Sequence, residues 1–265
     1  MSIIGKVDSL WRYPVKSMRG EELNEAFVGF SGIYGDRLFA FRSSASPKGF
    51  PYLTAREQRK LLRCRPRFRH PDKAARPLNL AEAESIAPGL GLNPVFGDTA
   101  DLMVEVEAPT GETLALDDPA LSRLLRDGVQ GAPELTVLRS DRAMTDCRPV
   151  SIFSLQTARQ LGDEMGTPVD PRRFRANIYL DLNAAGGFAE DGFVGRSVRI
   201  GSMVVLSILL RDPRCAMITL DPDTGESKPE FLKQVAKAHE GTAGVYGAVL
   251  VEGTLHKGDA VELLD

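Results

Sequence analysis

The sequence has few of the residues from which metal centres and disulfide frameworks are usually built. Its 265 residues include three cysteines, three histidines and one tryptophan. The cysteines are odd in number and far apart, which argues against a disulfide framework and an iron–sulfur cluster. The histidines stand alone, without the spacing of a zinc site. A P-loop and a Gly-x-Ser-x-Gly nucleophile elbow are also missing, which argues against two common enzyme classes.

Long apolar runs and a strong net charge are lacking too. The longest apolar run, residues 203–210, is interrupted by Ser207 and is much shorter than the roughly 20 residues that span a bilayer. Residues 1–8 lack the features of a signal peptide. With 33 basic and 36 acidic residues the formal net charge is −3, which disfavours binding to nucleic acid through overall charge. We therefore expect a soluble cytoplasmic protein that binds neither membrane nor nucleic acid.

The apolar segments are short and end at glycine or proline, a pattern typical of a mainly β chain. Glycine (25) and proline (17) are spread along the sequence without a repeat. Strands are predicted at residues 3–11, 38–42, 101–107, 135–138, 177–181, 198–210 and 248–252, with a final strand after Gly258. Helices are predicted at residues 54–63 from the capping box Thr54-Ala-Arg-Glu57, from Asp118-Pro119 to Gly128, between Ser154 and Gly162, and at residues 229–239.

These patterns predict an α+β fold, mainly β with short helices, in two packed β-rich lobes. The seam is expected between about residues 108 and 120, where Ala-Pro-Thr-Gly precedes the Asp-Asp-Pro helix start. We therefore divide the chain into residues 1–115 and residues 116–265. Because no Gly/Ser linker is present, the lobes are expected to pack against each other.

Several basic residues lie at turns and at the ends of predicted elements. An arginine beside glycine or proline can clamp a phosphate or carboxylate with two parallel hydrogen bonds. The alternative for each residue alone is an ordinary ion pair with a surface acid. The residues are Lys16, Arg37, Arg56, Arg175 and Arg214.

Cys215 is the most distinctive of the three cysteines. It follows an apolar strand and stands directly after Arg214, a position in which a thiol can act as a nucleophile or as a soft metal ligand. The alternative is that Cys215 is a small buried apolar residue. Cys64, in a basic run at a predicted helix end, is expected to be structural.

Several of these motifs occur in the order known from one family. They are Tyr13-Pro-Val-Lys-Ser-Met18, Gly35-Asp-Arg37, Thr54-Ala-Arg-Glu57, Phe174-Arg-Ala-Asn-Ile178, and Arg214-Cys215 followed by Asp221-Pro-Asp-Thr-Gly225. The chain resembles a MOSC-domain protein (molybdenum cofactor sulfurase C-terminal type) with its N-terminal MOSC β-barrel domain. In pattern it is similar to the amidoxime-reducing components of mitochondria and their bacterial counterparts. The resemblance extends over nearly the whole chain.

The resemblance implies a molybdenum–molybdopterin cofactor, with Cys215 as the catalytic residue and the thiolate ligand of the metal. Molybdenum held by dithiolene sulfurs accepts a further soft thiolate. Pro213 stands where close relatives often carry serine, which removes a donor to the cofactor. The positions that match the family's cofactor-binding residues are Lys16, Ser17, Arg37, Arg175 and Asn177, with Arg214 orienting the cofactor and Cys147 and Arg148 in a further cofactor segment.

On this resemblance the protein is expected to be an oxidoreductase that reduces N-hydroxylated compounds, such as amidoximes, by oxygen-atom transfer at molybdenum. The chain has no cluster, haem or flavin motif, so an external electron donor of the ferredoxin or flavin reductase type is expected. The cofactor is expected between the lobes, because its donors come from both halves of the chain. Two alternatives stay open: a sulfur carrier with a persulfide on Cys215, and a protein that binds or carries the cofactor without chemistry.

Overall fold

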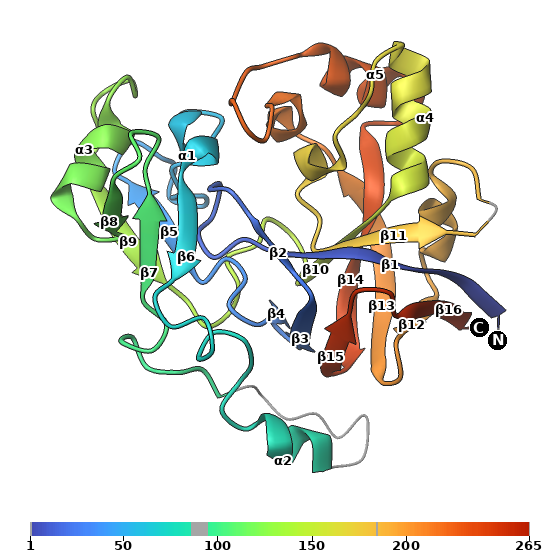
Figure 1. Ribbon diagram of the computed structural model, residues 1–265. Helices are drawn as coiled ribbons and strands as arrows, with labels where there is room; N and C mark the ends of the chain where they lie inside the picture. Colours follow the sequence, from blue (N-terminus) through green and yellow to red (C-terminus); the bar gives the residue numbers. More distant parts are fainter. Residues whose placement is uncertain (1, 86–94, 184, 265) are drawn as a thin grey trace.

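The structure is mainly β and forms two lobes that lie side by side (Figure 1). The computed structural model describes residues 2–85, 95–183 and 185–264. Within these ranges, five short α-helices accompany sixteen strands in four sheets. The predicted fold class is confirmed.

The second lobe is built on a closed β-barrel. Among the described residues, seven strands pair in the order β11-β10-β14-β13-β12-β16-β1, and β1 pairs with β11 to close the ring. β10 and β11 are parallel, and the other neighbours are antiparallel. The barrel strands are β1 (Ser2–Arg12), β10 (Val150–Ser154), β11 (Ile178–Leu182), β12 (Ser197–Ile200), β13 (Val204–Pro213), β14 (Thr242–Val251) and β16 (Ala260–Leu264).

Alternating apolar side chains fill the barrel. Along β13, Val204, Leu206 and Ile208 repeat every second residue and are fully buried in the barrel core. In β1 the pairing register shifts between Val7 and Ser9. Such a bulge inserts one residue into the alternation, so Val7 and Leu10 both reach the same core.

The first lobe contains two smaller sheets, three helices and its own apolar core. Strand β5 (Phe39–Ser43) pairs with β9 (Leu135–Arg139). The other sheet is formed by β6 (Arg65–Phe68), β7 (Val104–Glu107) and β8 (Thr113–Ala115), and the helices are α1 (Lys60–Arg63), α2 (Leu80–Ser85) and α3 (Pro119–Arg126). Helix α3 begins as predicted, because the Asp118 side chain accepts a hydrogen bond from the Ala120 N–H.

A three-stranded sheet joins the lobes. Strand β3 (Glu25–Gly29), which follows the short edge strand β2 (Glu21–Leu23), pairs with β4 (Gly32–Ile33) and with β15 (Gly253–His256) from near the end of the chain. The two faces of β3 are buried in different cores. Phe27 packs in the core of the first lobe, whereas Ala26 and Val28 pack in the barrel core.

Two helices cover one side of the barrel, as Figure 1 shows for α4 (Leu155–Met165) and α5 (Glu230–Ala238). Together with the 3₁₀ turn η1 (Pro171–Phe174) they enclose a third apolar cluster. In it the rings of Phe153 and Phe174 stack with centroids 4.1 Å apart, which fixes the end of η1. No helix in the described ranges combines the length and apolar character needed to cross a membrane.

The predicted helix at residues 54–63 is wrong in its first part. Only half of the capping box forms: Thr54 N donates to Glu57 Oε2 at 2.9 Å, but Thr54 Oγ1 accepts from Arg56 N and not from Glu57 N. Helix α1 nevertheless begins only at Lys60. The Gln58 side chain donates to the carbonyls of Leu125 and Asp127 and accepts from Lys60 N, which separates the turn from the helix.

Two other predicted boundaries are also wrong. Helix α4 passes Gly162 and ends at Met165, where it is capped by Gly166, whose φ of 63° is left-handed. Gly162 instead allows close packing, since a Cβ there would lie 3.2 Å from the Thr167 carbonyl oxygen. The strand predicted at residues 198–210 is a hairpin of β12 and β13, and Gly201 with φ 66° lies at its turn.

The division into residues 1–115 and 116–265 stays a prediction. Strand β1 lies at the start of the first segment, yet it closes the barrel whose other strands come from the second.

Candidate functional site

A polar cavity lies between the two lobes. Its described lining comes from three stretches of the chain, within residues 16–56, 145–177 and 212–246. The structure describes all nine predicted site residues, and eight of them line this cavity: Lys16, Ser17, Arg37, Arg148, Arg175, Asn177, Arg214 and Cys215. Cys147 is exposed and is not among the lining residues. The motifs therefore meet in space, while the role of each residue stays a prediction.

Lys16 is held at the wall formed by the loop after β1. Its buried Nζ donates to the Met144 carbonyl at 2.8 Å and forms an ion pair with Asp146. The same Nζ lies 5.3 Å and 5.0 Å from the ring centroids of Phe50 and Tyr52. Burial lowers the pKa of Lys16, although Asp146 opposes this effect. Burial by itself raises the pKa of Asp146, but Lys16, Arg37 and Arg56 together outweigh it and the pKa is lowered.

Arg37 forms a second ion pair at this wall, with Asp36. Asp36 is fixed in turn, because its Oδ1 accepts from Tyr13 N at 2.8 Å. Arg37 Nη2 donates to the Arg175 carbonyl at 3.1 Å and so reaches the opposite lobe. Burial alone lowers the pKa of Arg37, but Asp36 and the other negative groups nearby more than offset this and raise it.

Arg175 carries a buried polar atom without a partner. It follows η1 with a left-handed φ of 52°, and Asp170 caps the start of η1 by accepting from Arg172 N. Within the described residues, Arg175 Nη2 is buried and has no hydrogen-bond partner. Burial, together with repulsion from Arg37, lowers the pKa of Arg175 to about 10. A buried guanidinium nitrogen that lacks an acceptor is expected where an anion binds.

The Asn177 side chain joins strands at the edge of the cavity. Its Oδ1 accepts from Ser151 N at 3.2 Å, and its Nδ2 donates to the Trp11 carbonyl at 3.3 Å. These contacts tie β1 and β10 to the start of β11. A direct contact of Asn177 with a bound group stays a prediction.

Arg214 fixes the backbone that leads to Cys215. Its Nε donates to the Ala243 carbonyl at 2.7 Å and its Nη1 to the Phe174 carbonyl at 2.9 Å. Its Nη2 lies 2.7 Å from Asp212 Oδ2. Asp212 is almost completely buried, and burial raises the pKa of its carboxyl.

Cys215 is exposed at the cavity. It lies between β13 and the 3₁₀ turn η3 (Ala216–Thr219), and its carbonyl accepts from Ile218 N at 3.2 Å. The alternative of a small buried residue is therefore wrong for Cys215. Cys64 is instead the small buried residue of this kind, and burial raises the pKa of its thiol to about 12.

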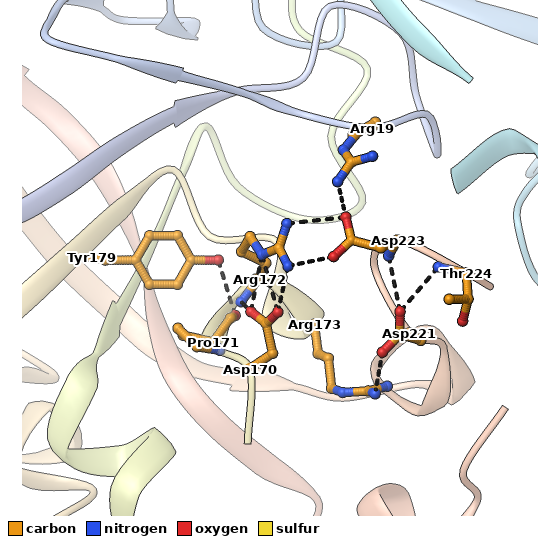
Figure 2. Close-up of polar contacts among 9 residues, drawn as sticks. All are labelled: Arg19, Asp170, Pro171, Arg172, Arg173, Tyr179, Asp221, Asp223 and Thr224. Carbon is orange, nitrogen blue, oxygen red and sulfur yellow. Dashed lines mark hydrogen bonds and ion pairs between the residues drawn. The ribbon is translucent and has the colours of Figure 1, made fainter. Parts of the chain in front are cut away.

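The loop from Asp221 to Gly225 binds the arginines of η1, as Figure 2 shows. Asp221 Oδ1 accepts from the backbone N–H groups of Asp223 and Thr224, both at 3.0 Å. Its other oxygen, Oδ2, accepts from Arg173 Nη2 at 2.9 Å. The Asp221 carboxylate thus forms the turn and binds η1 at the same time.

Asp223 extends these contacts to the first lobe (Figure 2). It accepts from Arg172 Nη1 and Nη2 at 3.2 Å and 2.7 Å and forms an ion pair with Arg19. Arg19 N donates to the Cys64 carbonyl at 3.1 Å. The loop therefore connects the segment after Cys215 with η1, which directly precedes Arg175, and with the first lobe.

The cavity is basic although the chain as a whole is slightly acidic. Its described lining contains seven Lys or Arg side chains and two Asp side chains, whereas the chain has a formal net charge of −3. In the part of the chain that the structure describes, no ion pair is found for three of these cations, and such a surplus attracts anions. The three are Arg56, Arg148 and Arg175.

Comparison with family models decides which kind of domain surrounds this cavity. Residues 139–262 match the MOSC domain, and residues 4–87 match the MOSC N-terminal beta barrel domain. The chain contains a MOSC domain. Cys215 and Arg175 lie in the range of the MOSC domain, and Lys16 and Arg37 lie in the range of its N-terminal companion.

Two curated proteins are similar to this MOSC protein. Mitochondrial amidoxime-reducing component 1 of Mus musculus is 25% identical over 306 aligned positions, which cover 98% of this chain and 83% of that protein. Mitochondrial amidoxime reducing component 2 of Bos taurus is 37% identical over 83 residues, or 31% of this chain. That alignment spans 23% of the bovine protein.

Solved structures with some likeness to the MOSC protein come from bacteria. The YUAD protein from Bacillus subtilis has a TM-score of 0.47 and 12% identity, and the match covers 98% of this chain and 94% of that one. YiiM from Geobacillus stearothermophilus has a TM-score of 0.34 and 19% identity, and covers 44% of this chain and 55% of that one. These likenesses are too distant to bear on function.

The sequence motifs of the MOSC protein did not include several residues of the cavity. Asp146 and Asp212 are the carboxylates that pair with Lys16 and Arg214. Each stands one or two residues from a predicted site residue, Asp146 before Cys147 and Asp212 before Arg214. This closeness to predicted site residues was the one feature of the sequence that could have indicated Asp146 and Asp212. Nothing comparable pointed to Tyr246, which lines the cavity from β14.

Proposed function

We propose that this MOSC protein binds a molybdenum–molybdopterin cofactor in the cavity between its lobes and reduces N-hydroxylated compounds there. The observation that carries the proposal is the convergence of the exposed Cys215 with basic side chains from both lobes. The similarity to proteins named amidoxime-reducing components supports the class of reaction.

The residues at the cavity fit such a cofactor. Arg175 Nη2 is a buried donor without an acceptor among the described residues, and a phosphate oxygen would supply one. The thiol of Cys215 is accessible, and sulfur is the ligand type that suits a soft metal centre. The cavity thus offers an anion site and a thiol in the same space.

The proposed binding roles combine the resemblance of the motifs with these contacts. Cys215 would bind the metal through Sγ. Lys16, Ser17, Arg37 and Arg175 would hold the phosphate, with the exposed lining residue Arg148 as a further contact. Asn177 and Arg214 are bonded mainly to backbone, so they would keep the walls and the ligand segment in place.

The chemistry that the cofactor supplies when bound is a two-electron oxygen-atom transfer, which with two protons converts an N–OH group into an amine and water. The protein's part is to position the substrate and to limit access of water. Phe50 and Met217 contribute apolar surface to the cavity wall for this purpose. The electrons would come from an external donor of the ferredoxin or flavin reductase type. We also propose that the protein is cytoplasmic and that its two domains comprise residues 1–115 and 116–265.

Metal analysis and a turnover assay test this function. The full chain is produced in a host that makes the cofactor, and we expect about one molybdenum per chain. The purified protein should reduce benzamidoxime with reduced methyl viologen as the donor. Cys215→Ala should lower both molybdenum content and turnover to a tenth or less, on the order of what loss of a direct ligand causes. Cys64→Ala, which removes a buried thiol of the first lobe, is the matched control and should keep both.

Other results would contradict the reductase function in distinguishable ways. Full turnover in Cys215→Ala would show that Cys215 is not the metal ligand on which the reaction depends. A mass increase of about 32 Da on Cys215 in protein without molybdenum would indicate a persulfide and the sulfur-carrier alternative. Bound molybdenum without reduction of any N-hydroxylated compound, under any donor, would indicate a carrier of the cofactor.

A further inference from the structure

Tyr13 contacts both of the arginines that meet across the cavity. The Cζ atom of Arg37 lies 4.6 Å from the centroid of the Tyr13 ring, and the Cζ atom of Arg175 lies 4.2 Å from it. The Tyr13 side chain is almost completely buried and is not among the described lining residues. The ring therefore lies behind the two guanidinium groups.

Hydrogen bonds hold Tyr13 to the chain segments of both arginines. Its carbonyl accepts from Arg37 N at 2.7 Å. Its hydroxyl donates to the carbonyl of Ala176, the neighbour of Arg175, at 3.2 Å. Tyr13 thus connects two segments that are more than a hundred residues apart in sequence, one through its backbone carbonyl and the other through its side chain.

The ring is also fixed in place from the side. A Cβ atom at Gly20 would lie 2.5 Å from the Tyr13 ring, a distance that would force the ring to move. Glycine at this position therefore lets the backbone cover the ring closely.

The two guanidinium groups need such a partner because they repel each other. After burial, the charge of Arg37 is the other influence that lowers the pKa of Arg175. Arg37 has a carboxylate in Asp36, but none is found for Arg175 in the described ranges. The negative face of an aromatic ring attracts cations without neutralising them. Arg37 is already paired with Asp36, so the aromatic ring leaves the charge of Arg175 available, whereas a second carboxylate would cancel it.

We propose that Tyr13 is a positioning residue that holds Arg37 and Arg175 together as one clamp for a phosphate group. This inference rests on the proposed cofactor cavity and adds the residue that prepares it for an anion. The clamp is formed before any ligand arrives, because the contacts with Tyr13 come from the protein alone.

Phosphate binding by the full chain tests the clamp. The protein is produced in a host that cannot make the cofactor, and the Kd for inorganic phosphate is measured by ³¹P NMR titration. Tyr13→Phe keeps the ring and loses the hydrogen bond to the Ala176 carbonyl, so it should raise the Kd by no more than about twofold. Tyr13→Leu removes the ring and should raise the Kd about fivefold or more. Phe41→Leu, the same loss of a buried ring in the core of the first lobe, is the matched control and should leave the Kd unchanged.

A second series separates attraction by the ring from simple packing. Phenylalanine with an increasing number of ring fluorines is introduced at position 13, which weakens the negative face of the ring at nearly constant shape. The Kd for phosphate should rise with each added fluorine. This series decides the question alone if Tyr13→Leu does not fold.

The results separate this inference from the proposed function. If the unchanged chain binds phosphate and fluorination has no effect, the role of Tyr13 is wrong while the anion site stands. An unchanged Kd in folded Tyr13→Leu leads to the same conclusion. If the unchanged chain binds no phosphate, both the proposed anion site and the clamp are wrong.

Discussion

At the scale of single residues, three of the residues assigned to phosphate have a backbone conformation that L-residues rarely adopt. Ser17, Arg37 and Arg175 have φ values of 66°, 46° and 52°. Each such residue costs roughly 1–2 kcal/mol. Local hydrogen bonds offset part of this cost, among them Arg175 N to the Arg172 carbonyl at 3.1 Å. These three residues line one cavity, where a binding function would maintain the strain, whereas the other described non-glycine residues with positive φ, Ala132, Phe188 and Glu240, are not among its lining residues.

Cys64 gives a residue-scale prediction about pH. Burial raises the pKa of its thiol from 9.0 to about 12. Above pH 9 the unfolded chain loses this proton while the folded chain keeps it, so stability falls as pH rises from about 9 to about 12. The loss is at most about 1.4 kcal/mol per pH unit. In Cys64→Ala the free energy of unfolding, measured with urea at pH 8 and pH 10, should fall less with pH than in the unchanged chain.

The control for this experiment is Cys147→Ala, which removes an exposed thiol. It should show the same decrease with pH as the unchanged protein. Equal decreases in all three proteins would show that Cys64 does not contribute to the alkaline loss.

At the scale of elements, the loop from Asp221 to Gly225 acts as a connector. Its carboxylates bind arginines of η1, and one of them also reaches Arg19 beside the first lobe (Figure 2). The two carboxylates differ in surroundings. Asp221 pairs with Arg173, whose side chain is 5% exposed, whereas Asp223 is 41% exposed and pairs with partly exposed arginines. The loop is therefore held more strongly at Asp221.

We expect Asp221→Ala to destabilise the protein more than Asp223→Ala. The first change leaves the buried Arg173 without its carboxylate and two backbone N–H groups without their acceptor, which costs about 2–4 kcal/mol. The second removes partly exposed ion pairs and costs about 1 kcal/mol or less. Urea unfolding at neutral pH measures both values. The reverse order would show that the contacts of Asp223 hold the loop.

At the scale of the whole molecule, the two ends of the chain build one barrel. Strand β1 pairs with β11 on one side and with β16 on the other, and both termini lie on the barrel side in Figure 1. The strands β3 and β4 add Ala26, Val28 and Ile33 to the barrel core. The lobes are thus interlocked, because the barrel cannot close without the first part of the chain.

Fragments should reveal this dependence. Residues 139–265 alone match the MOSC domain range but lack β1, so we expect no cooperative thermal transition by circular dichroism. Residues 1–37 joined to them by a flexible linker supply the missing strand and the residues of β3 and β4, and should restore a transition. A sharp transition in residues 139–265 alone would show that the barrel closes without β1.

Some features could be predicted because they depend on neighbours in sequence. The Asp118 cap and the amphipathic helix α5 follow from local hydrogen bonds and spacing. Local prediction failed at Gln58 because the distant carbonyls at the end of α3 accept hydrogen bonds from its side chain. At Gly162 it failed for a local reason, because this glycine packs closely against the Thr167 carbonyl, five residues further along the chain. Glycine often marks the end of a helix, but Gly162 lies within α4 and allows close packing.

The sequence by itself determined the class of fold, the residue types that can bind an anion and the exposed-thiol candidate, because these are properties of composition, order and local motif. Only the tertiary structure decided that Lys16 pairs with Asp146, that Arg37 and Arg175 share the ring of Tyr13, and that β1 closes the barrel. Except for the contact between Tyr13 and Arg37, these contacts join segments that are more than a hundred residues apart in sequence. Their pairing depends on how strands are ordered in space, which no local propensity encodes.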